Sequence, residues 1–412
     1  MTYAETCEYI NSLNKFGVVL GLDNINALLA QLGHPEEKLN IIHIAGTNGK
    51  GSVGAFLEAM LRAKGFKVGR YVSPSVFCYE ERFQKNGAFI TPDELVKFTE
   101  KVRAAAEKIG QPTVFEVETA IALCWFYDCD YVLLEVGMGG RLDATNAVKN
   151  TVCSVITTIG LDHTAILGDT LAKIAYEKAG IIKQNGRVFS AVLQDEAAEV
   201  LKRVSAEMNA ALTFCAEPVV HEDGSFDYKA LKGLKKSLSG DYQYKNAALA
   251  VEVFTSLFDD ENAVRTGLET ACWKGRFQVI EGEPTYIFDG AHNPQGVEAL
   301  MNALESYDKG NIVYICGIFA DKDYKTMVKT AAKRCKKVYT VTPPSPRALP
   351  AEELKNEFLK YVPDVKAADV KTAIEETMRM KDACVAVFGS LSFLGEAVAA
   401  VEREVGKWTE KK

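Results

Sequence analysis

A strand, a glycine-rich turn and a helix follow one another early in the chain, and this unit constrains the fold more than any other segment. Residues 39–45 are mostly apolar and predict a buried strand. The turn that follows reads Gly46-Thr-Asn-Gly-Lys-Gly-Ser52. Residues 52–64 carry apolar side chains at helical spacing, and Gly65 predicts the end of that helix. A buried strand that leads directly into a helix is typical of parallel sheets covered by helices.

The turn has the composition of a phosphate-binding loop. Its glycines let backbone N–H groups approach a phosphate, the helix N-terminus adds a favourable dipole, and Lys50 supplies a cation for the β- and γ-phosphates. The strict motif G-x-x-x-x-G-K-[ST] is not met, because Ile44 occupies its first glycine position and Gly51 separates Lys50 from Ser52. The alternative is a glycine-rich turn that binds nothing. A lysine between two glycines has little structural purpose, so we favour a variant phosphate loop.

Two series of strands and helices divide the chain and predict an α/β fold with two domains. The first series continues with predicted strands at 67–72, 131–136 and 152–157. The second series has predicted strands at 285–289, 311–317, 337–341 and 383–388. The polar stretch Glu281-Gly-Glu-Pro284 interrupts the pattern between them. We therefore expect a larger domain over residues 1–280 and a smaller one over residues 284–412.

The composition excludes several classes of protein. Its 48% hydrophobic and 25% charged residues are typical of a water-soluble globular protein, and no apolar run approaches the ~18 residues of a transmembrane helix. A net charge of −7 argues against non-specific nucleic-acid binding. Ten cysteines without a C-x-x-C pair predict reduced thiols. The first residues show no apolar export signal, so we expect a cytoplasmic protein without a membrane or nucleic-acid partner.

Three polar residues stand where a metal ion could be bound. Ser73 ends the predicted strand at 67–72, His163 follows the strand at 152–157, and Glu116 is flanked by apolar residues. A hydroxyl and a carboxylate are ordinary Mg²⁺ ligands, whereas a histidine is unusual. Each residue also has a simpler explanation, as a helix cap, a solvated side chain or a loop imidazole. The pattern alone leaves both interpretations open.

Lys178 lies on the apolar side of a predicted helix that has Asp169 as its expected N-cap and ends at Gly180. Leu171 and Ile174 form the apolar stripe, and Lys178 occupies the next position of that stripe. Burial lowers the pKa of a lysine, and a neutral amine can react with CO₂ to give a carbamate. A carbamate could approach a second Mg²⁺. The alternative is a lysine whose ammonium reaches solvent near the helix C-terminus.

These segments belong to a longer series of motifs that runs from about residue 20 to residue 395. Besides the glycine-rich turn, the series comprises Tyr71-Val-Ser-Pro74, Phe115-Glu116, the stretch 134–146, Leu161-Asp-His163, the stretch 177–182, Trp273 with Gly275-Arg276, Asp289-Gly-Ala-His-Asn-Pro294, Asp321-Lys-Asp323, Arg347-Ala-Leu349 and Phe388-Gly-Ser390. In these motifs the chain resembles the folylpolyglutamate synthase/dihydrofolate synthase family of the Mur ligase superfamily. It departs from the family at Tyr242, where histidine is common, and at Gln278, where glutamate is common. These departures leave substrate selection open.

The resemblance implies a phosphate-loop ATPase-type domain with a mostly parallel sheet, a smaller Rossmann-like C-terminal domain, and an active site in the cleft between them. The implied ATP-binding residues are Asn48, Gly49, Lys50, Gly51, Ser52, Asn246, Arg276 and Asp289. The implied Mg²⁺ ligands are Ser73, Glu116 and His163, with carbamylated Lys178 at a second Mg²⁺. The implied substrate contacts are Arg141, Leu142, Asp143 and His292, and the implied catalytic residues are Lys50, Lys178, His163 and Glu116. Glu135 is implied as a partner of the Mg²⁺ or of a water.

The resemblance also implies an ATP-dependent ligase, most simply a monomer, that adds L-glutamate to folate, and in some members to dihydropteroate, through an acyl phosphate. One alternative is a ligase of peptidoglycan precursors, but the phosphate loop begins only ~45 residues into the chain and leaves no room for a leading UDP-binding domain. A phosphate-loop ATPase or switch would leave residues 141–143 unexplained. A dinucleotide-dependent oxidoreductase is disfavoured because no G-x-G-x-x-G follows the first strand.

Overall fold

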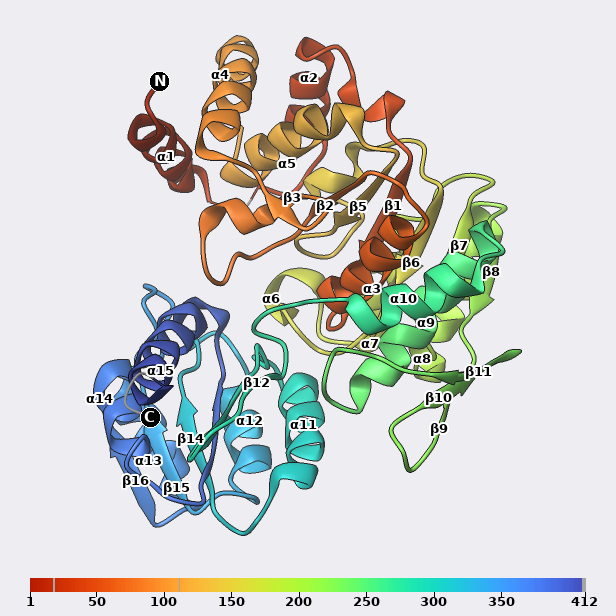
Figure 1. Ribbon diagram of the computed structural model, residues 1–412. Helices are drawn as coiled ribbons and strands as arrows, with labels where there is room; N and C mark the ends of the chain where they lie inside the picture. The colour runs from red at the N-terminus through yellow and green to blue at the C-terminus, as the bar shows by residue number, and fades with distance from the viewer. Residues whose placement is uncertain (18, 111, 410–412) are drawn as a thin grey trace.

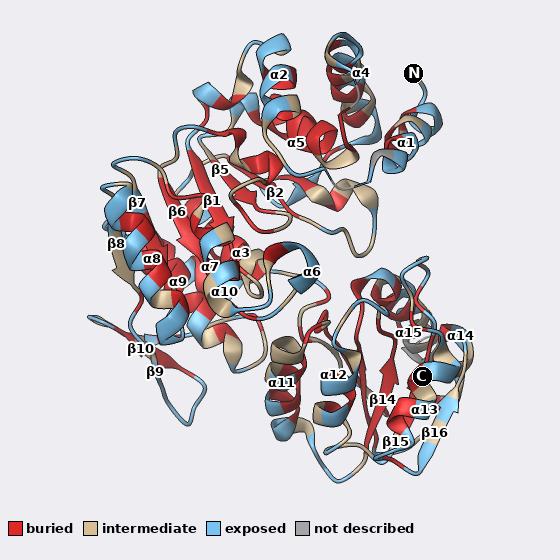
Figure 2. Cartoon of the chain, turned by 180° about the vertical axis from the view of Figure 1, so that it is seen from behind, coloured by how far each residue is buried: buried red, intermediate tan, exposed pale blue. Residues whose placement is uncertain are grey.

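The computed structural model describes residues 1–17, 19–110 and 112–409. These residues form two α/β domains, shown in Figure 1 as an upper lobe with the N-terminus and a lower lobe with the C-terminus. Both sheets are buried between helices whose outer faces are exposed (Figure 2). Among the described residues, every helix is too short or too polar to traverse a lipid bilayer. The predicted α/β class is confirmed.

The first domain is built on an eight-stranded sheet in the order β4-β3-β2-β5-β1-β6-β7-β8. Its strands are β1 (Ile41–Ala45), β2 (Val68–Tyr71), β3 (Phe83–Lys85), β4 (Ala88–Phe89), β5 (Tyr131–Glu135), β6 (Cys153–Ile156), β7 (Arg187–Ser190) and β8 (Ala211–Phe214). The six strands from β2 to β8 in this order are parallel, and β3 and β4 add an antiparallel edge. Every residue of β1 is buried, as expected for a central strand covered on both faces.

Helices cover both faces of this sheet. They are α1 (Tyr3–Ser12), α2 (Asp23–Gln31), α3 (Lys50–Ala63), α4 (Pro92–Ile109), α5 (Val114–Trp125), α6 (Thr164–Leu167), α7 (Leu171–Ala179), α8 (Asp195–Glu207), α9 (Tyr242–Leu257) and α10 (Glu261–Thr270). Ile42 and Ile44 of β1 pack with α3, α9 and α10, whereas Ile41 packs with α2, α4 and α5. Because side chains alternate along a strand, one apolar strand contributes to a separate core on each face of the sheet.

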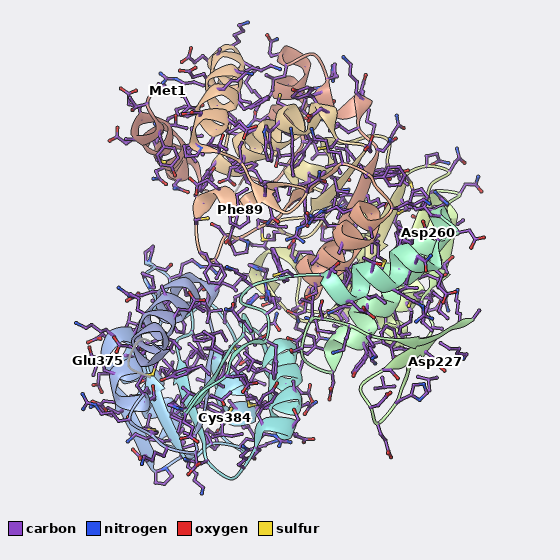
Figure 3. The ribbon with its side chains drawn as sticks, viewed as in Figure 1. Met1, Phe89, Asp227, Asp260, Glu375 and Cys384 are labelled. Carbon is purple, nitrogen blue, oxygen red and sulfur yellow. The ribbon has the colours of Figure 1, made fainter. Side chains whose placement is uncertain are left out.

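A small antiparallel sheet projects from the first domain between α8 and α9. It consists of β9 (Val219–Val220), β10 (Phe226–Tyr228) and β11 (Leu231–Leu234). Figure 3 marks Asp227 on this sheet, far from Cys384 in the second domain. None of the residues of β9, β10 and β11 lines a cavity between the domains.

The second domain has a six-stranded sheet in the order β12-β13-β17-β14-β15-β16. Its strands are β12 (Gln278–Ile280), β13 (Thr285–Phe288), β14 (Ile312–Cys316), β15 (Lys337–Thr340), β16 (Asp364–Ala367) and β17 (Cys384–Phe388). Helices α11 (Pro294–Ala303), α12 (Tyr324–Ala331) and α13 (Ala351–Phe358) cover one face, and α14 (Val370–Thr377) and α15 (Leu394–Thr409) the other. All strand pairs are parallel except β12 with β13.

Two details differ from the sequence prediction. Strand β12 pairs with β13, so the predicted junction at 280–284 falls inside one hairpin of the second sheet. We therefore propose that the domains divide in the connection 271–277. The N-cap of α7 is Thr170, whose hydroxyl accepts a hydrogen bond from the Lys173 backbone, whereas Asp169 forms an exposed ion pair with the Lys173 ammonium.

Candidate active site

The glycine-rich turn connects β1 to α3, which begins at Lys50, two residues earlier than predicted. Gly49 is its N-cap and adopts a left-handed conformation with a φ of 91°. A Cβ at Gly49 would lie 2.6 Å from Oδ1 of Asn246, so glycine is needed for the turn to approach α9. A Cβ at Gly51 would lie 2.8 Å from the indole of Trp273. Packing against the interdomain connection thus explains the extra glycine between the lysine and the serine.

Two positive charges face this turn. Lys50 Nζ donates to the carbonyl of Gly46 at 3.1 Å and lies 3.8 Å from Oε1 of Glu135, the last residue of β5. Burial raises the pKa of the Glu135 carboxyl, whereas Lys50 and Arg276 act in the opposite direction. Lys50 and Arg276 therefore lie close to one buried carboxyl beside the turn, and two such cations suit a triphosphate.

Asn48 connects the turn to the second domain. Its Nδ2 donates to Oδ1 of Asn293 and to Oε1 of Gln295, each at 3.2 Å. In return, Nδ2 of Asn293 donates to Oδ1 of Asn48 at 3.1 Å. Asn293 is also the N-cap of α11, where its side chain accepts from the backbone of Gly296. The paired amides therefore bring the N-terminus of α11 next to the glycine-rich turn.

The Asp289 carboxylate connects three segments beside the site by hydrogen bonds. Its Oδ2 accepts from the Tyr242 hydroxyl at 2.9 Å and from the Phe277 backbone at 2.8 Å, and its Oδ1 accepts from the Ala291 backbone at 2.8 Å. Burial raises the pKa of Asp289, and the neighbouring Arg276 opposes this shift. One carboxylate thereby fixes α9, the interdomain connection and the loop after β13.

Two adjoining cavities lie between the domains. The smaller cavity, of about 300 Å³, is lined by these predicted residues: Asn48, Gly49, Lys50, Gly51, Ser52, Lys178, Asn246, Arg276 and Asp289. The larger cavity, of about 460 Å³, is lined by the predicted residues Glu116, Leu142 and Asp143. Ser73, His163 and His292 line both cavities and mark the place where the two meet.

The three predicted metal ligands, Ser73, Glu116 and His163, all line the larger cavity. Glu116 forms a capping box at the start of α5, in which its Oε2 accepts from the backbone and the hydroxyl of Thr113. Burial lowers the pKa of His163 to about 4, so its imidazole is neutral near pH 7 and retains a lone pair. A neutral imidazole, a carboxylate and the Ser73 hydroxyl form a donor set that suits Mg²⁺ or Mn²⁺.

Lys178 is buried in the last turn of α7, as the helical spacing predicts. Its side chain lines the smaller cavity. Burial lowers the pKa of Lys178 to about 7, and the nearby Lys50 ammonium adds to this effect. A substantial fraction of the amine is therefore neutral near pH 7.

The segment 141–143 divides between the cavity and the protein interior. Leu142 and Asp143 line the larger cavity, but the Asp143 carboxylate also accepts hydrogen bonds from Thr145 and from the Met138 backbone. The Arg141 guanidinium donates to Oε1 of Glu177 at 2.8 Å and lines neither cavity. The structure therefore does not bring Arg141 to the site with the other predicted residues.

Asp162 and Lys322 are central residues to which the sequence prediction assigns no role, although both lie in motifs of the series, Leu161-Asp-His163 and Asp321-Lys-Asp323. Lys322 Nζ donates to Oδ1 of Asp162 at 2.5 Å, and Oδ2 of Asp162 accepts from Nδ2 of Asn293 at 3.2 Å. Although burial opposes it, the neighbouring His292 and Lys322 hold the pKa of Asp162 well below its usual value. The two motifs mark these residues separately, but nothing in the sequence indicates that they pair, because they lie 160 residues apart.

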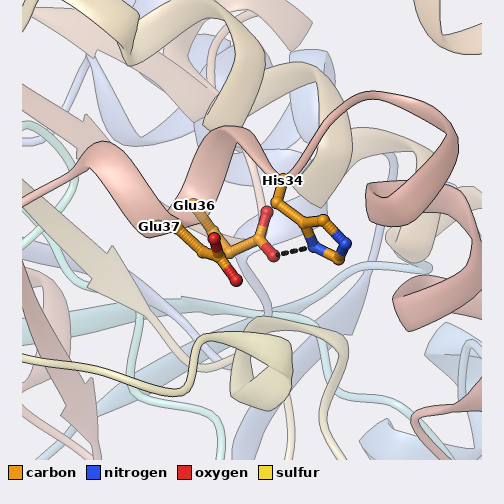
Figure 4. Close-up of side chains that lie close together, drawn as sticks. All are labelled: His34, Glu36 and Glu37. Carbon is orange, nitrogen blue, oxygen red and sulfur yellow. Dashed lines mark hydrogen bonds and ion pairs between the residues drawn. The ribbon is translucent and has the colours of Figure 1, made fainter.

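A second cluster of possible metal ligands lies outside both cavities. Figure 4 shows His34, Glu36 and Glu37 on the connection between α2 and β1, with Nδ1 of His34 2.9 Å from Oε1 of Glu36. Within the described ranges, no other group of three His, Cys, Asp or Glu side chains approaches so closely. Glu37 is exposed and none of the three lines the cleft, so this cluster is separate from the site.

The chain is similar to known proteins over both of its domains. The chain matches the Mur ligase middle domain over residues 44–254 and the glutamate ligase domain of Mur ligases over residues 275–391. It is 35% identical to the dihydrofolate synthase/folylpolyglutamate synthase of Bacillus subtilis, over 96% of this chain and 98% of the relative.

Solved structures of similar proteins contain nucleotides. Escherichia coli FolC in complex with DHPP and ADP superimposes with a TM-score of 0.90 at 30% identity, over 98% of this chain and 99% of that one. A bifunctional folylpolyglutamate synthase/dihydrofolate synthase with Mn, AMPPNP and L-glutamate bound gives a TM-score of 0.87 at 30% identity, over 98% of each chain. The chain therefore belongs to the folylpolyglutamate synthase/dihydrofolate synthase family of Mur ligases, and it is an ATP-dependent ligase.

Proposed function

We propose that this ligase joins the amine of L-glutamate to the side-chain carboxylate of tetrahydrofolate, and also to the carboxylate of dihydropteroate. The observation that carries the proposal is the meeting of two cavities at Ser73, His163 and His292. The smaller cavity contains the phosphate loop, and the larger has the size of a small-molecule site. The ligands of the similar structures, which include DHPP, ADP, AMPPNP and L-glutamate, support these assignments.

The chemistry requires activation, because a carboxylate does not acylate an amine in neutral water. The γ-phosphoryl group moves from ATP to the acceptor carboxylate and ADP leaves. The neutral amine of glutamate then attacks the acyl carbon, phosphate leaves, and the nitrogen loses a proton to give the amide. Lys50 and Arg276 offset negative charge on the transferring group by position rather than by covalent chemistry. No protein nucleophile is needed.

Closure of the two domains protects the acyl phosphate. Asn293 and Lys322 of the second domain contact Asn48 and Asp162 of the first, directly beside the junction of the cavities. These contacts limit the entry of water, which would otherwise hydrolyse the acyl phosphate. The acceptor side is formed by Leu142, with Asp143 and His292. We do not propose Arg141 as a contact of the acceptor, because its guanidinium donates to the Glu177 carboxylate.

Divalent cations offset the charge of the triphosphate when they are bound. Ser73, Glu116 and His163 would hold one ion, and we propose that Lys178 serves a second ion as a carbamate. Nζ of the neutral amine bonds to the carbon of CO₂ and releases a proton to solvent, which converts a buried cation into an anion. The burial of Lys178 and its place in the smaller cavity support this assignment.

ADP release with ATP, Mg²⁺ and glutamate tests the proposed function, with dihydropteroate in one reaction and tetrahydrofolate in another. Turnover of both acceptors is expected, and turnover of tetrahydrofolate alone would restrict the enzyme to folate extension. A phosphate-loop ATPase would release ADP without glutamate. Activity with neither acceptor, in protein that binds ATP, would contradict the assignment of a folate.

We also propose a cytoplasmic monomer. All ten cysteines are free thiols, which suits a reducing compartment. Light scattering coupled to size-exclusion chromatography would report one chain per particle, and a concentration-independent dimer would contradict the proposal.

A further inference from the structure

Arg82 stands at the wall of the larger cavity beside the junction with the nucleotide cavity. It ends the 3₁₀ turn Tyr79–Arg82, and its carbonyl accepts from the Val72 backbone at 3.0 Å, directly before Ser73. Within the described part of the first domain, Arg82 is the one lysine or arginine that lines this cavity. It thus brings a permanent positive charge to the part of the cleft assigned to the acceptor.

A buried carboxylate holds the guanidinium from behind. Oε2 of Glu118, on α5, accepts from Nη1 of Arg82 at 2.8 Å, and Oε1 of Glu118 accepts from the Tyr79 hydroxyl at 2.9 Å. Glu118 is only 2% exposed, whereas the Arg82 side chain is 18% exposed. The pair therefore fixes the orientation of Arg82 and leaves part of its side chain accessible from the cavity.

Most N–H donors of the Arg82 side chain have no acceptor among the described residues. Its side-chain hydrogen bonds within the described residues involve Nη1 alone, and its buried Nε has no acceptor there. A guanidinium carries a planar fork of N–H groups that matches a carboxylate. An anionic ligand in the larger cavity would supply an acceptor for Nη2, which unlike Nε is not buried.

The other two lysine or arginine side chains of this cavity come from the second domain, and they have carboxylate partners, as Arg82 does. Lys322 is paired with Asp162, and Arg347 donates from both Nε and Nη2 to Asp321. Arg347 is also half exposed, at 49% of its side chain. Arg82 is therefore the cation of the first domain that is best placed to bind the acceptor substrate.

From these contacts we infer that Arg82 binds the α-carboxylate of the terminal glutamyl unit of the acceptor, and so selects folates that already carry glutamate. This inference rests on the proposed function. Such an acceptor has two carboxylates near the reaction centre: the γ-carboxylate reacts, and the α-carboxylate keeps its charge in a partly enclosed cavity. Burial of that charge is unfavourable unless a cation pairs with it.

The same interaction recurs after each round of extension. Every added glutamate presents a new γ-carboxylate beside an α-carboxylate, so the terminal unit is chemically the same whatever the chain length. Dihydropteroate has only the reacting carboxylate and leaves the Arg82 fork without a partner. Arg82 is thus a specificity-determining residue that acts on extension and not on the first addition.

The test compares tetrahydrofolate with its α-carboxamide analogue, in which the terminal glutamate is replaced by isoglutamine. The wild-type enzyme is expected to favour the carboxylate by about 10- to 100-fold in kcat/KM, the range of a charge-assisted hydrogen bond. In Arg82→Gln/Glu118→Gln, which leaves no buried carboxylate unpaired, that preference should fall to within about 3-fold. Glu118→Gln alone keeps the cation and should keep the preference.

Each result bears on the inference differently. An unchanged preference in a folded double variant, or no preference in the wild-type enzyme, would overturn the role of Arg82. If the double variant does not fold, the same comparison is made with Arg82→Lys. Loss of the planar guanidinium should reduce the preference for the carboxylate by at least about 3-fold. An undiminished preference would again refute the inference. If the wild-type enzyme turns over neither acceptor, the proposed function itself is contradicted.

Discussion

The Tyr242 hydroxyl donates a 2.9 Å hydrogen bond to the Asp289 carboxylate and thereby joins α9 of the first domain to the loop after β13 of the second. Tyr242→Phe removes this bond and leaves Oδ2 of Asp289 with the Phe277 backbone as its remaining donor. We expect a loss of about 0.5–1.5 kcal/mol in the free energy of unfolding, the usual net value of a hydrogen bond. We also expect a few-fold higher KM for ATP. Denaturant unfolding and initial rates measure both, and an unchanged KM would show that the bond does not position the nucleotide wall.

Lys50→Ala should reduce the rate of ADP formation by at least about 100-fold, because it removes a cation of the smaller cavity that we propose to offset charge on the transferring phosphoryl group. The melting temperature should change little, since Lys50 occupies the first turn of α3 and is not part of the apolar core. Lys64→Ala, at the other end of the same helix, is the matched control. Normal ADP formation in Lys50→Ala would remove the glycine-rich turn from the mechanism.

Lys178→Ala should be inactive, and a short carboxylate such as acetate should restore part of its activity by replacing the carbamate. Acetate should leave the wild-type rate unchanged, which serves as the control. A difference map of the wild-type protein at high bicarbonate should show added density on Lys178. A map without that density, together with no rescue by acetate, would rule out the carbamate.

His163→Ala should raise the Mg²⁺ concentration at half-maximal rate by at least about 10-fold, the scale on which changes around a metal alter its affinity. A Mg²⁺ titration at saturating ATP measures the shift. His34→Ala alters the separate cluster outside the cleft and should leave the titration unchanged. The same titration curve in His163→Ala and wild type would exclude His163 as a ligand.

His43 should make the protein sensitive to acid. Its imidazole is fully buried on β1, and burial lowers its pKa well below 6.5. Below about pH 6.5 the unfolded chain binds a proton at His43 that the folded chain does not. The free energy of unfolding therefore decreases as the pH is lowered, by up to about 1.4 kcal/mol per pH unit. In His43→Gln this contribution should vanish. Unfolding free energies at about pH 7, 6 and 5 test the prediction, and equal slopes in both proteins would contradict it.

The sequence predicts strands and helices well because their apolar spacing is local. Lys178 illustrates this, since the stripe of Leu171 and Ile174 correctly indicates that it is buried. Contacts between distant segments leave no such signal. The pairing of β12 with β13 and the ion pair of Asp162 with Lys322 depend on how whole elements dock, so neither could be derived from spacing.

Loop side chains are equally hard to predict. Arg141 and Leu142 are adjacent in the sequence, yet Arg141 lies on Glu177 while Leu142 lines the larger cavity. A motif identifies such a segment as part of a site, but it does not indicate which way each side chain turns. Arg82 shows the converse, because the role that we propose for it can be inferred only when Glu118 and the cavity are seen together.

The contact between Gly51 and Trp273 limits which residues these two positions can accept during evolution. Any side chain at position 51 would collide with an indole that arrives from more than two hundred residues later in the chain. The two positions should therefore covary: a bulkier residue at 51 becomes tolerable only when the aromatic ring at 273 is lost. The sequence of a phosphate loop is usually treated as independent of distant residues. In this protein, however, Trp273 of the interdomain connection restricts position 51 to glycine. A loop transferred to a protein without that tryptophan would lose this packing contact.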